Sequence, residues 1–299
     1  MNQSEMTAKI EQGDGFIAAL DQSGGSTPKA LTGYGIEEGA WSSDEEMFDL
    51  IHQMRSRIIN SPCFASGKVL GAILFERTMD GTVGGKPTPQ ALIDIGVVPF
   101  IKIDKGLEAE ENGVQMMKPM SGLDELLARA RSLGVFGTKE RSVINAADEA
   151  GIAVLVAQQF QVAKQVLAHG LMPIIEPEVN IKSADRATSD DLLLTALLEE
   201  LDEIPEGQRV MLKLSIPANA GLFQPLVEHP KVLRVVALSG GFSREEACRE
   251  LARNPGMIAS FSRALLSDLR AQQSDEEFNQ TLGTAINEIY SASTAKVPA

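Results

Sequence analysis

The sequence predicts an α/β fold, a single (β/α)8 TIM barrel, from three observations. Short apolar runs recur along the chain, each within the roughly four to eight residues at which a buried strand is preferred over a helix. Segments with helical periodicity separate most of these runs, and no linker rich in Pro, Gly and Ser divides the chain. Strands that alternate with helices in this way are typical of the barrel, and a doubly wound open sheet is the alternative.

The expected strands are the apolar runs rich in strand-forming residues, taken in chain order. We expect each of them to be buried on both faces, because helices cover the outside of such a barrel. They are Gly15–Leu20, Gly71–Phe75, Val98–Asp104, Val135–Lys139, Leu171–Glu176, Arg209–Leu214, Val232–Ser239 and Met257–Ser262.

The segments between these strands carry helical signals. In Asp44–Ile59 the apolar residues fall on one face, and Ser43 with Glu46 matches a capping box. Gly122–Leu133 repeats the apolar pattern. Acidic residues after a hydroxyl residue favour a helix start, because the positive end of the helix dipole attracts them. Further helices are expected to begin at Thr188 or Ser189, followed by Asp190 and Asp191, at the capping box of Ser243 with Glu246, and at Asp275, whose helix ends at Tyr290 before a loose end rich in Ser, Thr and Ala.

The chain is acidic, with a net charge of −14, which argues against partners such as nucleic acid or an anionic membrane surface. A local cluster of cations can still hold a small anionic substrate. No apolar run reaches the roughly 20 residues that span a bilayer. Residues 1–15 are polar, so we expect no signal peptide. Cys63 and Cys248 are the only cysteines, and we expect inert, reduced thiols. We expect a cytoplasmic homo-oligomer whose chain is one domain over residues 1–299, with a mobile C-terminal tail over residues 274–299.

Polar or charged groups stand at the carboxyl ends of all the expected strands, where TIM barrels place their chemistry. A single charge there is ordinary for a solvated edge, but a polar group at every end is harder to explain in that way. Some of them form i, i+2 pairs, whose side chains point to the same face if the strand continues. In order, the ends carry Asp21, Glu76, Lys102 with Asp104, Lys139 with Arg141, Glu176 with Glu178, Lys213, Ser239-Gly240-Gly241, and Arg263.

Lys213 lies in the apolar run Val210–Leu214, where a lysine is costly unless it is needed. One interpretation is a buried lysine paired with a carboxylate. The other is an amine nucleophile, which burial beside Lys102 and Lys139 would favour by disfavouring the charged form. Forming an imine also requires a proton donor, and Glu176-Pro177-Glu178 supplies two carboxyl groups. We expect burial beside a like charge to keep one of them protonated, and a solvent-exposed pair is the alternative.

Two glycine-containing loops are candidate phosphate sites. Ser239-Gly240-Gly241 follows the seventh expected strand and Arg263 follows the eighth, which is the usual phosphate position in a TIM barrel. Ser23-Gly24-Gly25-Ser26 follows the first strand and offers a second set of donors. With several cations between them, the two loops suggest a small-molecule sugar substrate that carries two phosphates.

Metal and cofactor chemistry is disfavoured by the sequence. His52, His169 and His229 are the only histidines, and none lies at a strand end or at metal-ligand spacing from another. No Walker-type or dinucleotide fingerprint is present. We therefore predict an enzyme that needs neither a metal nor a cofactor.

Several stretches, in consistent order from residue 18 to residue 265, resemble the class I (Schiff-base) fructose-bisphosphate aldolases, and the pattern looks more like their short bacterial branch. The Glu-Pro-Glu segment and the lysine with Ser-Gly-Gly are specific in combination. The matching stretches are Ala18–Ser26, Gly71–Thr78, Ile101–Gly106, Pro173–Glu178, Leu212-Lys213, Leu238–Gly241 and Phe261–Leu265.

The resemblance implies reversible, metal-independent cleavage of fructose 1,6-bisphosphate to dihydroxyacetone phosphate and glyceraldehyde 3-phosphate, in glycolysis and gluconeogenesis. The alternatives are another Schiff-base aldolase for a related phosphorylated sugar, or a non-catalytic binding protein on the same barrel. By the resemblance, Lys213 is the Schiff-base lysine and Glu176 the acid/base. It also implies that Glu178 orients Lys213 and Lys139, that Asp21 contacts the C4 hydroxyl, that Ser239, Gly240, Gly241 and Arg263 hold the C1 phosphate, and that Ser23, Ser26, Lys102 and Arg141 hold the C6 phosphate.

Departures from the animal members of that family concern the phosphate contacts and the return of a proton. Glu140 replaces a tryptophan, Ala30 an arginine and Ser262 a glycine. Animal members also end in a tyrosine that carries a proton to the enamine. Tyr290 is the nearest candidate for that role, and a structural aromatic residue on the last helix is the alternative.

Overall fold

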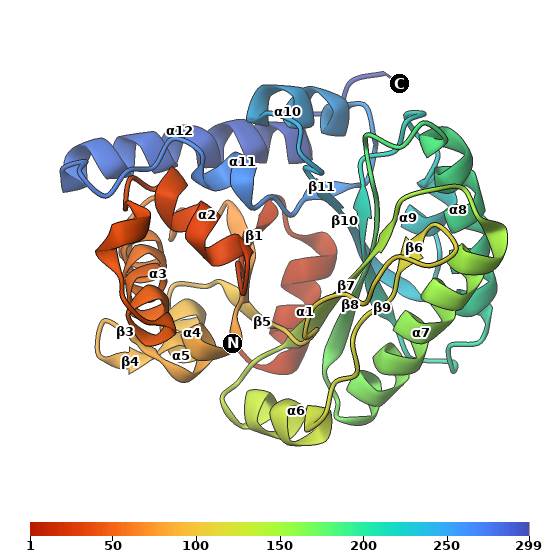
Figure 1. Cartoon of the computed structure of the whole chain (residues 1–299), viewed down its shortest axis with the longest axis horizontal. Coiled ribbons are helices and arrows are strands. Elements are labelled where there is room, and N and C mark those ends of the chain that lie inside the picture. The colour runs from red at the N-terminus through yellow and green to blue at the C-terminus, as the bar shows by residue number, and fades with distance from the viewer. Residues whose placement is uncertain (299) are drawn as a thin grey trace.

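The computed structural model describes residues 1–298, and within that range eight parallel strands form the wall of a barrel (Figure 1). Their order around the wall follows the chain, as expected for right-handed strand–helix–strand connections. The Ala19 N–H donates to the Phe261 carbonyl at 3.2 Å and brings the first strand against the last, which nearly closes the sheet. The predicted (β/α)8 TIM barrel is thus confirmed over the doubly wound alternative. The strands are β1 (Phe16–Leu20), β2 (Val69–Leu74), β5 (Val98–Lys102), β7 (Gly137–Ile144), β8 (Met172–Val179), β9 (Val210–Ser215), β10 (Val232–Leu238) and β11 (Ile258–Ala259).

Short accessory strands lie outside this wall. The strand β6 (Val114–Gln115) pairs antiparallel with β7 above the barrel, and β3 (Thr82–Val83) pairs with β4 (Lys86–Pro87) in a separate hairpin.

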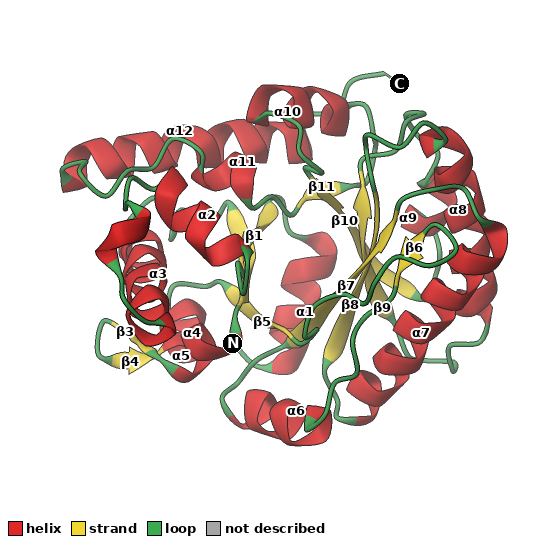
Figure 2. Cartoon of the chain, viewed as in Figure 1, coloured by secondary structure: helices red, strands yellow, loops and turns green. Residues whose placement is uncertain are grey.

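Helices surround the strands (Figure 2). None of the helices within residues 1–298 is both long and apolar enough to cross a membrane. The helices are α1 (Gln3–Gln12), α2 (Ser26–Gly33), α3 (Asp44–Asn60), α4 (Glu76–Asp80), α5 (Thr88–Asp94), α6 (Leu123–Ser132), α7 (Glu149–Ala168), α8 (Arg186–Asp202), α9 (Gln224–Val227), α10 (Arg244–Ala252), α11 (Arg263–Leu266) and α12 (Asp275–Thr294), with a 3-10 turn at Glu38–Ala40.

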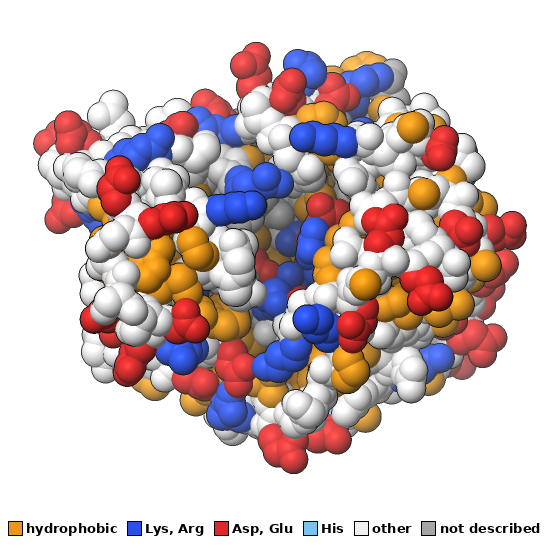
Figure 3. Space-filling model, in the orientation of Figure 1, with side chains coloured by type: hydrophobic (Ala, Val, Ile, Leu, Met, Phe, Trp, Pro, Cys, Tyr) orange, Lys and Arg blue, Asp and Glu red, His pale blue; other side chains and the backbone are white. Residues whose placement is uncertain are grey.

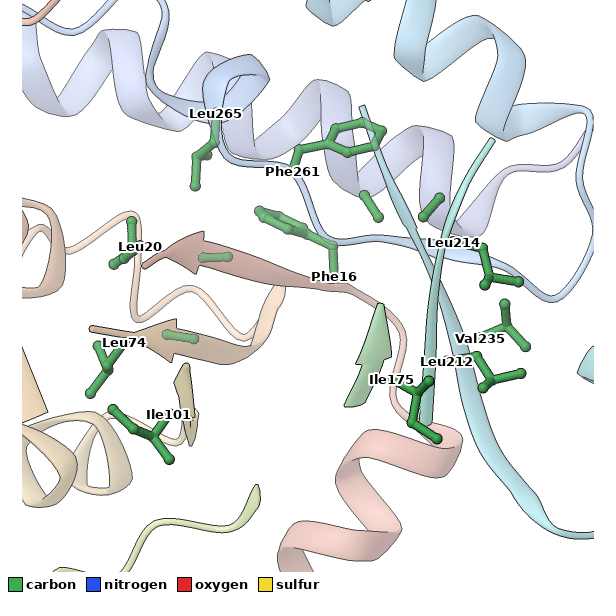
Figure 4. Packing of buried hydrophobic residues seen from close by; sticks show 14 of the residues in the cluster. Phe16, Leu20, Leu74, Ile101, Ile175, Leu212, Leu214, Val235, Phe261 and Leu265 are labelled. Atoms are coloured by element: carbon green, nitrogen blue, oxygen red, sulfur yellow. The ribbon is translucent and has the colours of Figure 1, made fainter. Parts of the chain in front are cut away.

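Alternation along the strands divides the apolar residues between two cores, because successive side chains of a strand point to opposite faces. Ile174 and Met211 belong to a cluster inside the barrel. Their chain neighbours Ile175 and Leu212 belong to the larger cluster between strands and helices (Figure 4). The strands are therefore buried on both faces, as expected.

The helix α1 covers the amino end of the barrel. Its Met6 and Ile10 are buried in the interior cluster together with Leu70 of β2 and Leu233 of β10. In Figure 1 this helix is visible behind the ring of strands. Apolar side chains thus fill the barrel from the end at which its strands begin.

All the predicted strands are present, with shifts at their ends. The strands β7 and β8 run past the predicted ends at Lys139 and Glu176 to Ile144 and Val179, because they stay paired with each other over their whole length. The last strand, β11, is shorter than predicted. Because β7 and β8 continue, their i, i+2 charged pairs lie in regular strand.

The prediction for the start of α8 is wrong. The helix begins at Arg186, ahead of Thr188 and Ser189. Asp190 therefore lies beyond the first turn, and its side chain is buried. Its carboxylate is buried and accepts a hydrogen bond from the Ala218 N–H at 2.8 Å, which ties α8 to the loop after β9. Burial raises the pKa of Asp190 to about 6.

The predicted capping boxes differ in outcome. Ser243 and Glu246 form both reciprocal hydrogen bonds at the start of α10, as predicted. Ser43 caps α3 by accepting from the Glu46 N–H, but the Glu46 carboxylate accepts from Ser42 instead of returning to Ser43. This second box is half formed because another hydroxyl residue precedes the cap.

The last helix is longer than predicted. It ends at Thr294 and not at Tyr290, because Ser293 is buried and its hydroxyl donates to the carbonyl one turn back. The predicted loose end is therefore helical as far as Thr294. Ala299, the last residue of the predicted tail 274–299, lies outside the described residues, and the mobility of that tail stays a prediction.

Candidate active site

A cavity of about 970 Å³ opens at the carboxyl ends of the barrel strands. In the face drawn in Figure 3, Lys and Arg side chains gather in and around a central hollow, and Asp and Glu side chains spread over the outer surface. A local excess of cations favours an anionic ligand although the whole chain is acidic. The predicted site residues that line the cavity are Asp21, Ser23, Ser26, Lys102, Lys139, Arg141, Glu176, Glu178, Lys213, Ser239, Gly240 and Arg263.

Lys139 is the centre of a buried ionic network in the cavity. Its Nζ lies 2.7 Å from Asp21 Oδ2, 3.0 Å from Glu176 Oε2 and 3.9 Å from Asp104 Oδ2. Glu176 also reaches the other way, because its Oε1 lies 3.1 Å from Lys213 Nζ. The side chains of Lys139, Glu176 and Lys213 are 3%, 4% and 5% exposed. Charges of opposite sign therefore alternate from Asp21 to Lys213 in a space that largely excludes water.

This network fixes the charge of its members. Burial alone would raise the pKa of Asp21 and of Glu176, but Lys139 and Lys213 hold the pKa of both carboxyl groups below its usual range. Burial alone would lower the pKa of Lys139, but Asp21, Glu176 and Asp104 raise it instead. At neutral pH, Lys139 is therefore a fixed cation between two carboxylates.

The register of β7 and β8 brings these groups together. Lys139 and Arg141 are two residues apart on β7, and Glu176 and Glu178 are two apart on β8, so each pair points to the same face. The parallel pairing sets Arg141 beside Glu176. Two neighbouring strands thus supply two cations and two carboxylates to the cavity.

Two interpretations of the Glu-Pro-Glu segment are wrong. We expected a like charge nearby to keep one carboxyl protonated, but residues two apart on a strand lie about 6.6 Å from each other, and each carboxylate meets its own cations. Glu178 was also expected to orient Lys213 and Lys139. Instead, Glu178 Oε2 accepts a hydrogen bond from Arg141 Nε at 2.6 Å, and Glu176 contacts both lysines.

Lys102 is held against the cavity wall by Asp104. Its Nζ donates to Asp104 Oδ1 at 2.6 Å and to the Asp104 carbonyl at 2.8 Å. The same Oδ1 accepts from the Gly106 N–H at 3.3 Å. Lys102 is thus a positioned cation that lines the cavity.

The loop after β10 is shaped by glycine. Gly240 and Gly241 have φ values of 60° and 112°, which residues with a Cβ rarely adopt. A Cβ on Gly240 would lie 2.7 Å from Ile181 Cγ2. Gly240 and Ser239 line the cavity, but Gly241 does not, and a Cβ there would lie 3.7 Å from Arg263 Nη2. The backbone turn at Gly241 carries the chain past the Arg263 side chain, and the phosphate contact expected of Gly241 stays a prediction.

The loop after β1 is also open to the cavity. A Cβ on Gly24 or Gly25 would meet no atom within 4 Å, so this backbone leaves space for a ligand. The Ser26 hydroxyl, however, accepts from the Ser23 N–H at 2.9 Å and donates to the Ser23 carbonyl at 2.8 Å. Ser26 therefore holds the loop together, whereas the Ser23 hydroxyl makes no hydrogen bond within residues 1–298.

Tyr290 lies away from the cavity. Its ring centroid is 5.3 Å from the Nζ of Lys68, which directly precedes β2 at the amino end of the barrel. This position does not fit the proton-shuttle role and favours the structural alternative.

Other polar candidates are also accounted for. Glu76 turns away and pairs with Lys105 and Arg129. None of the histidines lines the cavity, and over the described residues no group of three or more His, Cys, Asp or Glu is placed to hold a metal ion. Burial raises the pKa of the Cys248 thiol to about 11.

A model of the family described as glycolytic class-I fructose-bisphosphate aldolase matches residues 3–199. The chain belongs to this family. Asp21, Lys139 and Glu176 lie in the matched part, and Lys213 lies beyond it. The predicted family is thus confirmed, and with it an aldolase of the carbon–carbon lyase type.

Solved structures support the barrel of this aldolase family. A fructose-bisphosphate aldolase from Plasmodium falciparum, in complex with TRAP and an inhibitor, is 21% identical with a TM-score of 0.80, over 99% of this chain and 96% of that one. An archaeal fructose-1,6-bisphosphate aldolase, whose catalytic lysine is bound to the carbinolamine of its substrate, is 12% identical with a TM-score of 0.55, over 97% and 100%. Cgl0159 of Corynebacterium glutamicum is 13% identical with a TM-score of 0.57, over 97% and 92%.

Sequence reasoning missed some residues that line the aldolase cavity, among them Gln22, Lys29 and Ser260. A signal for Lys29 was present, because it lies three residues after Ser26 on α2 and such residues share a helix face. Gln22 gave no signal, because its role depends on contacts with distant segments of the chain.

Proposed function

We propose that this aldolase catalyses the reversible cleavage of fructose 1,6-bisphosphate to dihydroxyacetone phosphate and glyceraldehyde 3-phosphate, through an imine on Lys213. The contact of 3.1 Å between Lys213 Nζ and Glu176 Oε1 carries the proposal. The reaction would serve glycolysis and gluconeogenesis, and we propose a cytoplasmic homo-oligomer as its setting.

The ion pair supplies both groups that imine formation needs. Transfer of one proton from the Lys213 ammonium to Glu176 gives a neutral amine and a carboxylic acid together. The amine nitrogen attacks the C2 carbonyl to form a carbinolamine, and Glu176 then protonates the departing hydroxyl as water. The iminium forms, Glu176 returns to the carboxylate, and the net products are the iminium and one water molecule.

In the proposed cleavage step, Asp21 accepts the proton that is released. When the C3–C4 bond breaks, its electron pair moves toward the iminium, and the C4 hydroxyl proton passes to the Asp21 carboxylate. Lys139 lies between Asp21 and Glu176, so its fixed charge favours the carboxylate form to which each group returns after it has carried a proton.

The arrangement of cations supports a substrate with a phosphate at each end. Both sets line the cavity, and we assign Arg263 with the Ser239–Gly240 turn to the C1 phosphate and Lys102 with Arg141 to the C6 phosphate. Phosphate is well matched by guanidinium groups and backbone N–H donors.

A second candidate is a Schiff-base aldolase for a related monophosphate sugar. The internal bonds of Ser26 favour it, because they remove one expected C6-phosphate donor. Substitution of Ser23 by alanine discriminates the two, because a bisphosphate enzyme loses affinity and a monophosphate enzyme does not.

The proposed function is tested by borohydride reduction in the presence of dihydroxyacetone phosphate, followed by peptide mass mapping. We expect a reduced adduct on Lys213, no adduct in Lys213→Met, and cleavage of fructose 1,6-bisphosphate that survives EDTA. Absence of the adduct, or activity lost to the chelator, would contradict the proposal.

A further inference from the structure

Gln22 connects three separate segments at the edge of the cavity. Its side-chain Nε2 donates to the Ala19 carbonyl at 3.1 Å and to Ser262 Oγ at 2.5 Å. Its Oε1 and its backbone carbonyl accept from Arg55 Nη2 at 3.2 Å and 2.5 Å. One amide thus joins α3, the end of β1 and the residue before Arg263.

Arg55 fixes the direction of these hydrogen bonds. It is fully buried, its Nη1 donates to Thr78 Oγ1 at 2.7 Å, and in the described part of the chain no carboxylate pairs with it. Burial lowers the pKa of Arg55 to about 10, although Asp21 opposes the shift, so the guanidinium stays charged at neutral pH. A guanidinium only donates, so the group that faces it must be the Gln22 oxygen, and the amide nitrogen must face Ser262.

The Ser262 hydroxyl therefore accepts from Gln22 and retains its own hydrogen. Ser262 does not use that oxygen to cap α11, and among the described residues its hydroxyl donates to no protein group. It lines the same cavity as Arg263 and Ser239. A hydroxyl whose hydrogen has no protein acceptor, beside a guanidinium that binds anions, is suited to donate to an anionic oxygen.

We propose that the Ser262 hydroxyl donates a hydrogen bond to the phosphate that binds beside Arg263. Gln22 and Arg55 are the positioning residues that hold the hydroxyl in this orientation. The inference rests on the proposed function, in which that phosphate belongs to the half of the substrate bonded to Lys213. This hydrogen bond would be specific to the present chain, because animal members of the family have a glycine at this position and a glycine has no side-chain donor.

The test uses inorganic phosphate as the probe, with binding to the full-length protein measured by titration calorimetry. We expect Ser262→Ala to weaken phosphate binding by about tenfold or more, the usual effect of losing a hydrogen bond to a charged group. Gln22→Glu replaces the donor that faces Ser262 by an acceptor, so the hydroxyl turns toward it and phosphate binding weakens as well. This variant loses the hydrogen bond to the Ala19 carbonyl but gives Arg55 a carboxylate partner, and the melting temperature is measured to show that the variant is folded.

The double variant separates hydrogen-bond direction from added charge. In the Ser262→Ala background, Gln22→Glu should weaken phosphate binding much less than in the wild type. Equal effects in both backgrounds, or an unchanged phosphate affinity in Ser262→Ala, would overturn the inference. A wild type that binds phosphate but forms no imine with dihydroxyacetone phosphate would instead contradict the proposed function, and the two failures are distinct.

A second readout is the preference of the protein for a phosphorylated ligand. The efficiency of borohydride trapping is measured with dihydroxyacetone phosphate and with dihydroxyacetone, which differ only in the phosphate. Ser262→Ala should lower the ratio of the two trapping efficiencies, whereas a general disturbance of the barrel lowers both alike.

Discussion

Lys213 and Glu176 form a buried ion pair whose nitrogen and oxygen lie 3.1 Å apart, with both side chains at most 5% exposed. A carboxyl in this position can exchange a proton with the amine without the help of bulk water. We expect Glu176→Gln to lower kcat by about 100-fold to 10,000-fold, because it removes the acid that expels water from the carbinolamine. Stopped-flow measurement of imine formation checks this.

The matched control is Glu178→Gln, two residues along the same strand. Its carboxylate pairs with Arg141 and not with Lys213, so its loss of kcat should be at least about tenfold smaller. Equal losses in both variants would contradict the roles assigned to the two glutamates.

Lys139→Met removes the cation that Asp21, Glu176 and Asp104 share. Loss of one partner from a buried pair costs about 3–5 kcal/mol, and we expect a destabilisation of that order. In the wild type, Asp21 and Glu176 have lowered pKa values, so they stabilise the fold above their unfolded pKa and lose this contribution as the pH falls through their folded pKa. In the variant, the carboxylates repel each other, so stability should fall as pH rises.

Urea unfolding at about pH 5 and about pH 8 measures this difference. Adding Asp21→Asn should restore part of the stability at the higher pH, because it removes one of the facing charges. A loss of stability that is the same at both pH values would contradict this account.

Glu140 lies on the face of β7 opposite Lys139 and Arg141, and it is fully buried with no hydrogen-bond partner for its carboxyl oxygens in the described structure. Burial, with help from Asp104, raises its pKa well above the ordinary value of 4.5. The unfolded chain therefore releases this proton at a lower pH than the folded one, and stability is lost as pH rises above 4.5. We expect Glu140→Gln to be more stable than the wild type at about pH 8 and equal to it near pH 4. Each kcal/mol gained in the free energy of unfolding should raise Tm by about 2–4 °C. Calorimetry across pH tests this, and an identical pH profile would refute it.

Tyr290→Phe should leave kcat for cleavage within about twofold of the wild type, because the ring lies beside Lys68 at the far end of the barrel. Removal of the tyrosine hydroxyl would matter only if the predicted mobile tail carried it to the cavity. Hydrogen exchange of residues 274–298 during turnover reports that motion directly. A large loss of kcat with rapid exchange of α12 would reinstate the proton-shuttle role.

The barrel and most of the cavity could be predicted because they depend on local patterns. Apolar runs mark the strands, and a polar residue at the end of each run marks the cavity lining. Alternation along β7 explains why Lys139 and Arg141 were expected together, and they are.

Pairing between side chains from different strands could not be predicted in this way. The partner of Glu176 depends on how three neighbouring strands are staggered, which a single strand does not reveal. The burial of Asp190 and the contacts of Gln22 depend on loops that return from distant parts of the chain. Such contacts account for the errors at Glu178 and at the start of α8.

The helix α1 closes the amino end of the barrel, and the cavity opens to solvent at the carboxyl end. In the proposed reaction, the dihydroxyacetone phosphate half stays covalently bonded to Lys213, deep in the cavity, until water hydrolyses the imine. The free aldehyde must therefore leave first, by the route through which the substrate came in. Architecture thus sets the kinetic order of product release, and dihydroxyacetone phosphate should act as a competitive product inhibitor toward fructose 1,6-bisphosphate.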